Sequence, residues 1–282
     1  MMSNFDLNEM EKTFTRLLDK EKVEKQIEEG RKNWIKEEKE NPNNFSYWFV
    51  RLAHLDCVPS SIVFKLPDWM LDAYLTPEDE DKVYAYFEKN VIPIVQQAFP
   101  SGECFMKNGC FSNKFDFSSA CHLTDLSTDN IIKHFFNIEN MALLYETNGD
   151  LEVVFRQYIK ANEKTPTIYN GMPFRTELRA FYDFDKHEYL YDVFYWDWDY
   201  CHDKMPERDM DTYEKNYYYV CSDYEENQDF IKHFLEEKLK DVDLKGKWSV
   251  DVLVDDDNNY WIIDMAIAER SAYWDPEKRA YL

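Results

Sequence analysis

Alternating hydrophobic and polar positions dominate the chain from residue 104 onward. Short runs of this kind lie at 104–107, 114–117, 151–159, 178–184 and 189–196, and two further arms lie within 248–266. Successive side chains of a strand point to opposite faces, so these runs predict β-strands. Helical spacing appears at 128–136 and 227–240, and we expect a long irregular acidic segment over 196–229. Hairpins mixed with helices predict an α+β fold.

The first hundred residues differ, because their hydrophobic positions recur near helical spacing. This spacing predicts a charged amphipathic helix over 8–40, and Thr76 with Pro77 predicts the start of a helix that runs to about Phe99. We therefore expect a mainly helical region over 1–100, followed by the strands.

The two arms within 248–266 form a predicted hairpin that carries two carboxylates. With a four-residue loop, Asp256 to Asn259, Asp251 lies opposite Asp264, where like charges would destabilise the sheet unless a cation lies between them. Oxygen ligands favour Mg²⁺ or Mn²⁺ over zinc. A five-residue loop would shift the register by one and send the carboxylates to opposite faces. The pattern itself leaves both loops open.

The composition narrows the classes of function. The 282 residues are 44% hydrophobic, enough for a substantial core, and the formal net charge is −23. Because no extended basic surface remains, we expect no nucleic-acid partner, and an anionic ligand must meet a local group of cations. No apolar run reaches the roughly 20 residues of a membrane span, and the six cysteines have no repeated spacing. We expect a cytoplasmic protein with reduced thiols and no membrane partner.

Two lysines stand out in this acidic chain. Lys107 and Lys114 bracket the small polar loop of FMKNGCFSNK, in which Ser112 offers a hydroxyl and Gly109 allows close backbone approach. Folded as a hairpin, the loop would place both ammonium groups side by side around an anion such as a polyphosphate. The alternative is a turn with two solvated lysines.

Two arginines lie on predicted strands, Arg156 in VVFRQYI and Arg179 in TELRAFYDF. Phosphate contact is one interpretation of both. Otherwise Arg156 faces solvent, and Arg179 forms an ion pair with Glu177 or Asp183 on its own strand.

Taken in order, the segments FMKNGCFSNKFDF, LEVVFRQYI, FRTELRAFYDF and VDVLVDDDNNYWIIDM resemble the ATP-grasp fold and, within it, the cell division cycle protein 123 family. The match covers about 104–275. It implies two α+β subdomains with ATP between them, a first over 101–155 with the phosphate loop and a second over 156–282 with the metal hairpin. The helical region over 1–100 lies outside the resemblance.

The resemblance also implies roles for individual residues. Asp251 and Asp264 would bind Mg²⁺, and Lys114 and Arg179 would be the catalytic cations. The implied nucleotide site consists of Lys107, Ser112, Lys114, Arg156, Gln157, Tyr158, Ile159 and Arg179. The hinge over 155–159 would hydrogen-bond adenine through its backbone.

One position departs from the family, because Ala266 stands where a metal-binding Asn is usual. Three alternatives follow: Glu269 or water replaces it, a single Mg²⁺ is bound, or the nucleotide binds without transfer chemistry. The resemblance therefore leaves two activities open: a nucleotide-dependent assembly factor with a protein partner, as the family is associated with initiation factor 2, or a ligase that joins a carboxylate to an amine through an acyl phosphate. An alternative class is a nucleotidyltransferase resembling RNA ligases, with Lys107 as the adenylated nucleophile.

Overall fold

The computed structural model describes residues 20–71, 73, 79–145 and 150–278, and the chain forms two compact units, 1–41 and 42–282. In the first unit, the helix α2 (Lys20–Glu40) agrees with the helical spacing of that segment, whereas 8–19 lie outside the described residues. Ion pairs at i,i+4 spacing, such as that between Lys32 and Glu28 at 2.8 Å, support this helix.

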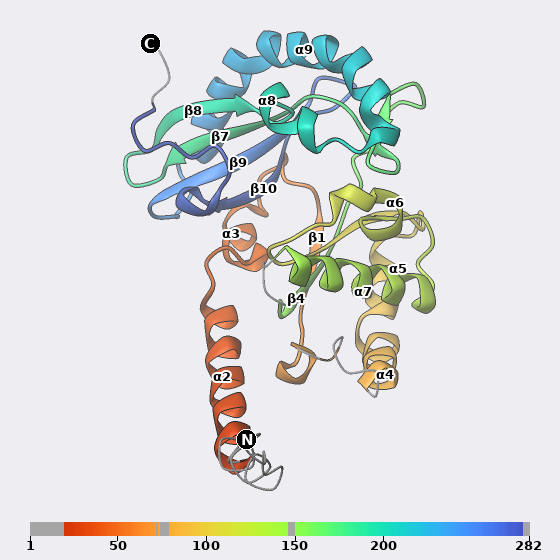
Figure 1. Cartoon of the computed structure of the whole chain (residues 1–282). Coiled ribbons are helices and arrows are strands. Elements are labelled where there is room, and N and C mark those ends of the chain that lie inside the picture. Colours follow the sequence, from red (N-terminus) through yellow and green to blue (C-terminus); the bar gives the residue numbers. More distant parts are fainter. Residues whose placement is uncertain (1–19, 72, 74–78, 146–149, 279–282) are drawn as a thin grey trace, which may run out of the picture. The chain divides into compact units, whose positions relative to one another are not determined.

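The second unit contains two four-stranded sheets (Figure 1). The first has the order β1 (Ser61–Lys65), β4 (Glu152–Arg156), β2 (Cys104–Asn108) and β3 (His122–Leu123), with antiparallel neighbours throughout. Every residue of β2 and β4 is buried, since α7 (Thr128–Leu144) packs against β2, and α4 (Glu80–Asn90) packs against α7 and α5 (Ile92–Ala98). One segment of the expected helical region, β1, therefore belongs to this sheet.

The second sheet has the order β10 (Tyr260–Ile267), β9 (Lys247–Val254), β7 (Glu177–Asp183) and β8 (Glu188–Phe194), again antiparallel. The long helix α9 (Glu207–Leu239) lies along this sheet and packs on β8 (Figure 1). The expectation of an irregular segment over 196–229 is therefore wrong. Buried residues recur along α9 at helical spacing, as Tyr213, Val220 and Ile231 show, and they cover the sheet.

Short elements connect the two sheets and the helices. They are α3 (Phe45–Leu52), η1 (Asp68–Met70), η4 (Lys114–Asp116), α6 (Phe117–Ala120), β5 (Thr167–Ile168), β6 (Met172–Pro173), α8 (Trp198–Cys201), η5 (His202–Lys204) and η6 (Ala268–Arg270). The strand expected over 114–117 is wrong, because η4 and α6 occupy these residues. The N–H groups of Phe117 and Ser118 donate to the carbonyls of Tyr169 and Asn170, which satisfies the start of α6.

The hairpin of β9 and β10 combines features of both loops that the sequence left open. Tyr260 pairs with Val254, so the loop has five residues, and the Asp255 carboxylate accepts the N–H of Asn259 at 2.8 Å. A β-bulge then shifts the register between Ile262 and Asp264, and Asp264 lies opposite Asp251 after all. The expected carboxylate pair therefore forms by a different route.

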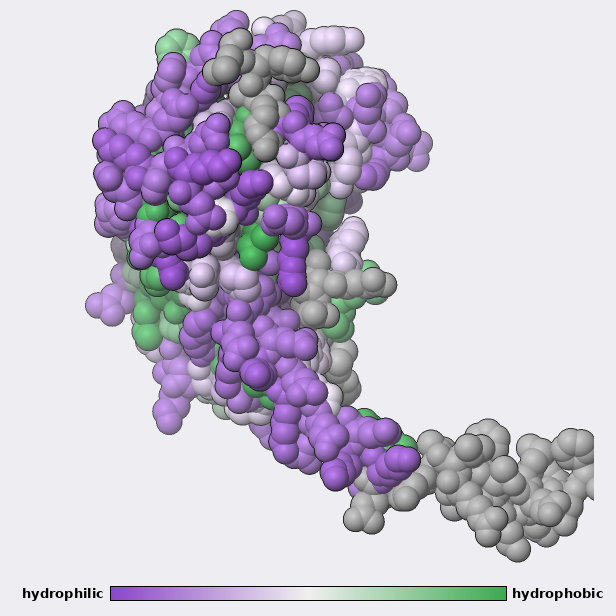
Figure 2. All heavy atoms as spheres, turned by 90° about the vertical axis from the view of Figure 1, so that its left-hand side faces the viewer, coloured by the Kyte–Doolittle hydropathy of each residue, from purple (hydrophilic) through white to green (hydrophobic). Residues whose placement is uncertain are grey.

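The α+β class is confirmed by the helices and the two antiparallel sheets. Among the described residues, no helix is both long enough and apolar enough to cross a membrane. Hydrophilic residues cover most of the face that Figure 2 shows, and hydrophobic residues form only small separate areas on it. The described residues therefore form no broad apolar surface on this face.

Candidate functional site

The site begins with three residues that lie in a row across the second sheet. Arg179 on β7 pairs with Asp251 on β9, and Asp251 pairs in turn with Asp264 on β10. Directly opposed residues of neighbouring strands share one face of a sheet. The Arg179 Nε and Nη2 atoms donate to the two Asp251 oxygens at 2.8 and 2.9 Å, so one carboxylate is held by a bidentate arginine.

The second carboxylate is held by a lysine of the first sheet. The Lys107 Nζ on β2 lies 3.0 and 2.8 Å from the two oxygens of Asp264. Burial raises the pKa of Asp264, but the charge of Lys107, its hydrogen bond, and the charges of Arg156 and Lys114 together lower that pKa below its usual value. The first sheet therefore meets the second at the carboxylate pair.

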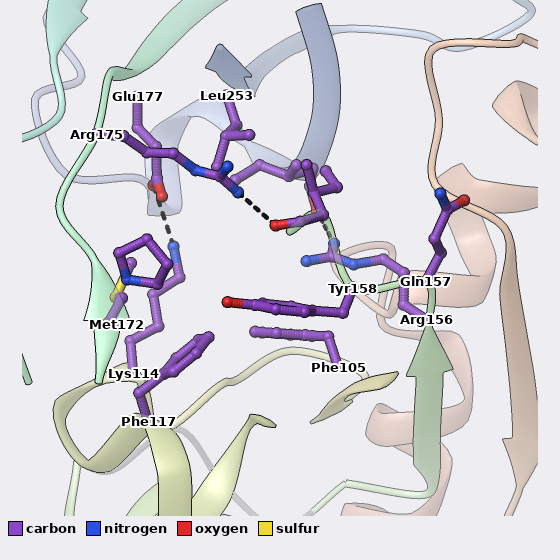
Figure 3. A pocket seen from close by; sticks show the side chains of 13 residues that line it. Phe105, Lys114, Phe117, Arg156, Gln157, Tyr158, Met172, Arg175, Glu177 and Leu253 are labelled. Atoms are coloured by element: carbon purple, nitrogen blue, oxygen red, sulfur yellow. Dashed lines mark hydrogen bonds and ion pairs between the residues drawn. The ribbon is translucent and has the colours of Figure 1, made fainter. Parts of the chain in front are cut away.

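The second lysine of the polar loop contacts a different carboxylate. The Lys114 Nζ lies 3.4 Å from the Glu177 Oε2 at the start of β7 (Figure 3). Burial lowers the pKa of Lys114, but the charges of Glu177, Asp251 and Asp264 and the nearby Tyr195 raise it well above its usual value, so the ammonium stays charged. The loop is thus not a hairpin with two adjacent lysines, although Asp264 attracts both.

These contacts also correct the alternative interpretation of Arg179, an ion pair with Glu177 or Asp183 on its own strand. Its ion pair is with Asp251 on the neighbouring strand, whereas Glu177 on its own strand holds Lys114 and Asp183 accepts the N–H of Asp185. Burial lowers the pKa of Arg179, but the charge and hydrogen bonds of Asp251 raise it by more. The net pKa is therefore higher than usual.

Arg156 is buried, which excludes the alternative interpretation that it faces solvent. Its Nη1 donates to the carbonyl of Ile263, the bulged residue of β10, and its guanidinium carbon lies 4.5 Å from the centre of the Phe105 ring. Its Nε is buried and has no hydrogen-bond partner among the described residues. Arg156 therefore connects the two sheets beside Asp264, and its Nε–H group has no acceptor among the described residues.

Gly109, the glycine of the polar loop, has no room for a side chain. A Cβ at Gly109 would lie 2.5 Å from Asp150 Oδ2, and the Gly109 carbonyl accepts the N–H of Phe45 at 3.0 Å. The close approach that only glycine allows is therefore made to Asp150, within the protein.

Two cavities flank the row of ion pairs. The first, of about 50 Å³, is lined by Phe105, Lys114, Phe117, Arg156, Gln157, Tyr158, Ile159, Met172, Pro173, Arg175, Glu177, Leu253 and Ile263. The second, of about 200 Å³, is lined by Asn43, Gly109, Cys110, Arg179, Ser249, Asp251, Asp264, Met265, Ala266, Arg270, Ser271 and Ala272. Lys114 and Glu177 belong to the first cavity, and Arg179 with both aspartates belongs to the second. Neither cavity is lined by Ser112 or Glu269.

The hinge expected over 155–159 lies along the first cavity. The Gln157 N–H donates to the carbonyl of Ser60 at 2.8 Å, and Arg175 Nη2 donates to the carbonyl of Ile159 at 2.7 Å. The Tyr158 ring reaches across the cavity, as Figure 3 shows, and its centre lies 4.2 Å from that of His122 and 6.2 Å from that of Phe117. Tyr158 therefore fills much of the apolar space beside the hinge.

Sequence reasoning missed several residues of the first cavity, among them Arg175, Phe105 and Phe117. One signal was present for Arg175. It alternates with Glu177 and Arg179 in FRTELRAF, which places three charged residues on one side of a predicted strand. The aromatic residues carry no comparable signal, since the chain holds 20 Phe and 20 Tyr.

The carboxylate pair meets the requirements of a magnesium site only in combination with a ligand. The described residues contain no group of three or more His, Cys, Asp or Glu that could hold a metal ion. Asp251 and Asp264 supply two carboxylates beside the larger cavity. Mg²⁺ is commonly bound by one or two carboxylates together with substrate phosphates, so the pair fits a metal that arrives with a nucleotide.

No family model and no curated protein sequence matches the chain. The structure is similar to C-terminally truncated Cdc123 from Schizosaccharomyces pombe, with 17% identity and a TM-score of 0.48 over 82% of this chain and 85% of that one. It is also similar to the D-alanine-D-alanine ligase from Coxiella burnetii, with 11% identity and a TM-score of 0.39 over 79% of this chain and 46% of the ligase.

A further similar structure is the D-alanine-D-alanine ligase from Bacillus anthracis complexed with ATP, with 12% identity and a TM-score of 0.34 over 79% of this chain and 52% of the ligase. The resemblance expected from the sequence is thus also found between structures. At these identities and TM-scores it assigns neither a ligand nor an activity to this chain.

Proposed function

We propose that this protein binds ATP with Mg²⁺ between its two sheets. The observation that carries the proposal is the pairing of Asp251 with Asp264, each held by a cation, at a place where cations of both sheets converge. Lys107 comes from the first sheet, Lys114 from the loop that follows it, and Arg179 from the second sheet. A chain with a net charge of −23 concentrates these cations at one point, which suits a polyphosphate.

An exchange of partners explains how charged residues that are already paired can bind a nucleotide. Phosphate oxygens would replace the carboxylates as partners of Lys107, Lys114 and Arg179. The released carboxylates of Asp251 and Asp264 would then hold Mg²⁺, which bridges phosphate oxygens and neutralises their charge. The unpartnered Nε of Arg156 offers one more donor in the same region.

The base would enter the first cavity, between the aromatic residues and the hinge. Ligand cavities usually hold roughly 300–1,000 Å³, whereas this one has about 50 Å³ because Tyr158 crosses it. The Tyr158 side chain must therefore move when adenine binds. The N–H groups of Tyr158 and Ile159 make no hydrogen bond with other described residues, which leaves them available to the base.

The reaction that follows binding has two forms. As a ligase, the protein would use Lys114 and Arg179 to stabilise the charge of the phosphoryl group that passes to a substrate carboxylate, and it would release ADP and phosphate only with an added acid and amine. As an assembly factor, it would bind ATP without turnover, and its protein partner would depend on the nucleotide. We expect either activity in the cytoplasm, where the six cysteines, all free among the described residues, stay reduced.

The geometry gives no support to covalent adenylation of Lys107. This side chain is 2% exposed, and both oxygens of Asp264 hold its ammonium. A nucleophilic lysine must instead present an unprotonated amine to the α-phosphate.

Calorimetric titration with ATP in the presence of Mg²⁺ tests the proposal. We expect the parent protein to bind ATP·Mg²⁺, with affinity reduced by EDTA, and we expect Arg179→Met and Asp251→Asn each to weaken binding at least tenfold. Lys204→Met, an exposed lysine outside both cavities, is the matched control and should bind as the parent does. Absence of binding by a folded parent, or equal affinity in all four proteins, contradicts the proposal.

A further inference from the structure

Tyr195 contacts two of the site's cations with one ring. It follows β8 directly, and its N–H donates to the carbonyl of Glu177 at 3.1 Å, which fixes the backbone beside the start of β7. The Lys114 Nζ lies 4.8 Å from the centre of the Tyr195 ring, and the guanidinium carbon of Arg179 lies 5.3 Å from it. Both distances are within the range of a cation–π contact, which extends to about 6 Å.

These cations come from separate parts of the chain. Lys114 belongs to η4, which follows the first sheet, and Arg179 belongs to β7 in the second. Each also has its own carboxylate, Glu177 for Lys114 and Asp251 for Arg179. The Tyr195 ring is a contact that the two cations share, and a bound anion would not have to displace it when it replaces the carboxylates.

The ring remains neutral under ordinary conditions. The charge of Lys114 lowers the pKa of the Tyr195 phenol, while burial and the carboxylates of Asp251 and Glu177 raise it, and the net pKa is above its usual value. Because the phenol is neutral, the two cations interact with the face of the ring and not with a phenolate charge.

We propose that Tyr195 is a positioning residue that keeps Lys114 and Arg179 together as one binding unit for a polyphosphate. The inference rests on the proposed function, because it concerns how the same site recognises the phosphates of ATP. When the carboxylates give up these cations to the ligand, the shared ring still fixes the position of both. The affinity for a ligand that contacts both cations, such as ATP, should therefore depend on the ring. The affinity for a ligand with one phosphate should not.

The experiment compares Tyr195→Leu, which removes the ring, with Tyr195→Phe, which removes only the hydroxyl. Binding of ATP, AMP and inorganic triphosphate, each with Mg²⁺, is measured by calorimetry. Two lost contacts of roughly 0.5–1 kcal/mol each correspond to about a 5- to 30-fold loss of affinity. We expect Tyr195→Leu to lose affinity for ATP and triphosphate by this factor and to change its affinity for AMP less than twofold. Tyr195→Phe, which keeps the ring, should bind all three ligands as the parent does.

Tyr200→Leu is the matched control, because Tyr200 also has a cation over its ring, with Lys204 Nζ 3.4 Å from the centre, but lines neither cavity. This variant should bind all three ligands as the parent does. If Tyr195→Leu unfolds, Tyr195→Met, which keeps more of the side-chain length, takes its place in the same comparison.

Three results would overturn the inference while the parent still binds ATP. These are an unchanged affinity of Tyr195→Leu for ATP, an equal loss for AMP and ATP, and a loss in Tyr195→Phe as large as that in Tyr195→Leu. A folded parent that does not bind ATP at all contradicts the proposed function itself, so the two failures are distinguishable.

Discussion

The guanidinium of Arg156, at the end of β4, donates a hydrogen bond to the carbonyl of Ile263, the residue at which β10 bulges. A bulged residue has no partner in the ladder, so its carbonyl needs a donor from elsewhere. The bulge is also what brings Asp264 opposite Asp251 after a five-residue loop. One contact between the two sheets therefore supports the register on which the carboxylate pair depends.

We expect Arg156→Met to destabilise the protein, because it removes a contact that supports the register of Asp264 opposite Asp251. The change leaves the Ile263 carbonyl without its charged donor, which costs about 2 kcal/mol in the free energy of unfolding. Urea unfolding measures this difference, with Arg208→Met, an arginine of α9 with an exposed side chain, as control. Equal unfolding midpoints for Arg156→Met and the parent would show that the bulge does not need this donor.

A second prediction concerns the dependence of stability on pH at Asp264. The pKa of this carboxyl is lower in the folded protein than its ordinary value of 3.8. A group with a lowered folded pKa contributes stability above the unfolded pKa and loses it as the pH falls through the folded pKa. We therefore expect Asp264→Asn to be less stable than the parent by about 3 kcal/mol from pH 7 to pH 5, because the loss of the ion pair leaves the charge of the buried Lys107 unpaired.

Below about pH 4 the difference between Asp264→Asn and the parent should shrink, because protonation makes the parent carboxyl neutral, as the amide of the variant is at every pH. Urea unfolding at a series of pH values measures it. A difference that stays constant down to pH 2.5, or that grows as the pH falls, would contradict the lowered pKa.

The loop of the hairpin provides a third prediction. The Asp255 carboxylate accepts hydrogen bonds from the N–H of Asp257 and Asn259 and from Trp261 Nε1, at 3.0, 2.8 and 2.8 Å. Asp255→Ala removes these three and also the contacts of Asn259 Nδ2 with the two Asp255 oxygens at 3.1 and 3.0 Å. It should lower the free energy of unfolding by about 1–3 kcal/mol. Asp257→Ala in the same loop is the matched control, since Asp257 is exposed and should change stability by less than about 0.5 kcal/mol. Thermal unfolding of the two variants separates these values, and equal losses would rule out a special role of Asp255.

Local pattern predicted the strands of the site, and tertiary contacts decided how they meet. Alternation alone located β2, β4, β7 and both arms of the hairpin, because side-chain period is a property of the strand itself. It could not supply the bulge at Ile263, whose donor Arg156 is 107 residues away in the chain. Nor could it choose Asp251 as the partner of Arg179, because that choice depends on the register between β7 and β9.

The same distinction explains the error in α9. Its acidic and aromatic residues, with Tyr217, Tyr218 and Tyr219 in succession, obscured the buried positions that repeat at helical spacing. Tyr218 and Tyr219 are 79% and 77% exposed, so two of the three tyrosines lie on the solvent side of the helix. Hydrophobic character alone therefore does not identify the buried residues of this segment, and only the packing of the helix against the sheet does.

A fourth prediction follows from the closed first cavity. The Tyr158 ring lies across the space beside the hinge, where it contacts His122 and Phe117, and the remaining volume of about 50 Å³ is too small for a base. If ATP binds there, the ring must first leave, and the binding-competent state is only a fraction of the free protein. Tyr158→Ala removes this step, so we expect ATP to associate several-fold faster with the variant, while the number of bound nucleotides stays at one. Stopped-flow measurements with a fluorescent ATP analogue report the association rate constant.

Tyr145→Ala, another partly exposed tyrosine that lines neither cavity, is the control. An association rate constant for Tyr158→Ala equal to or below that of the parent would place the base elsewhere or show that the ring does not obstruct it.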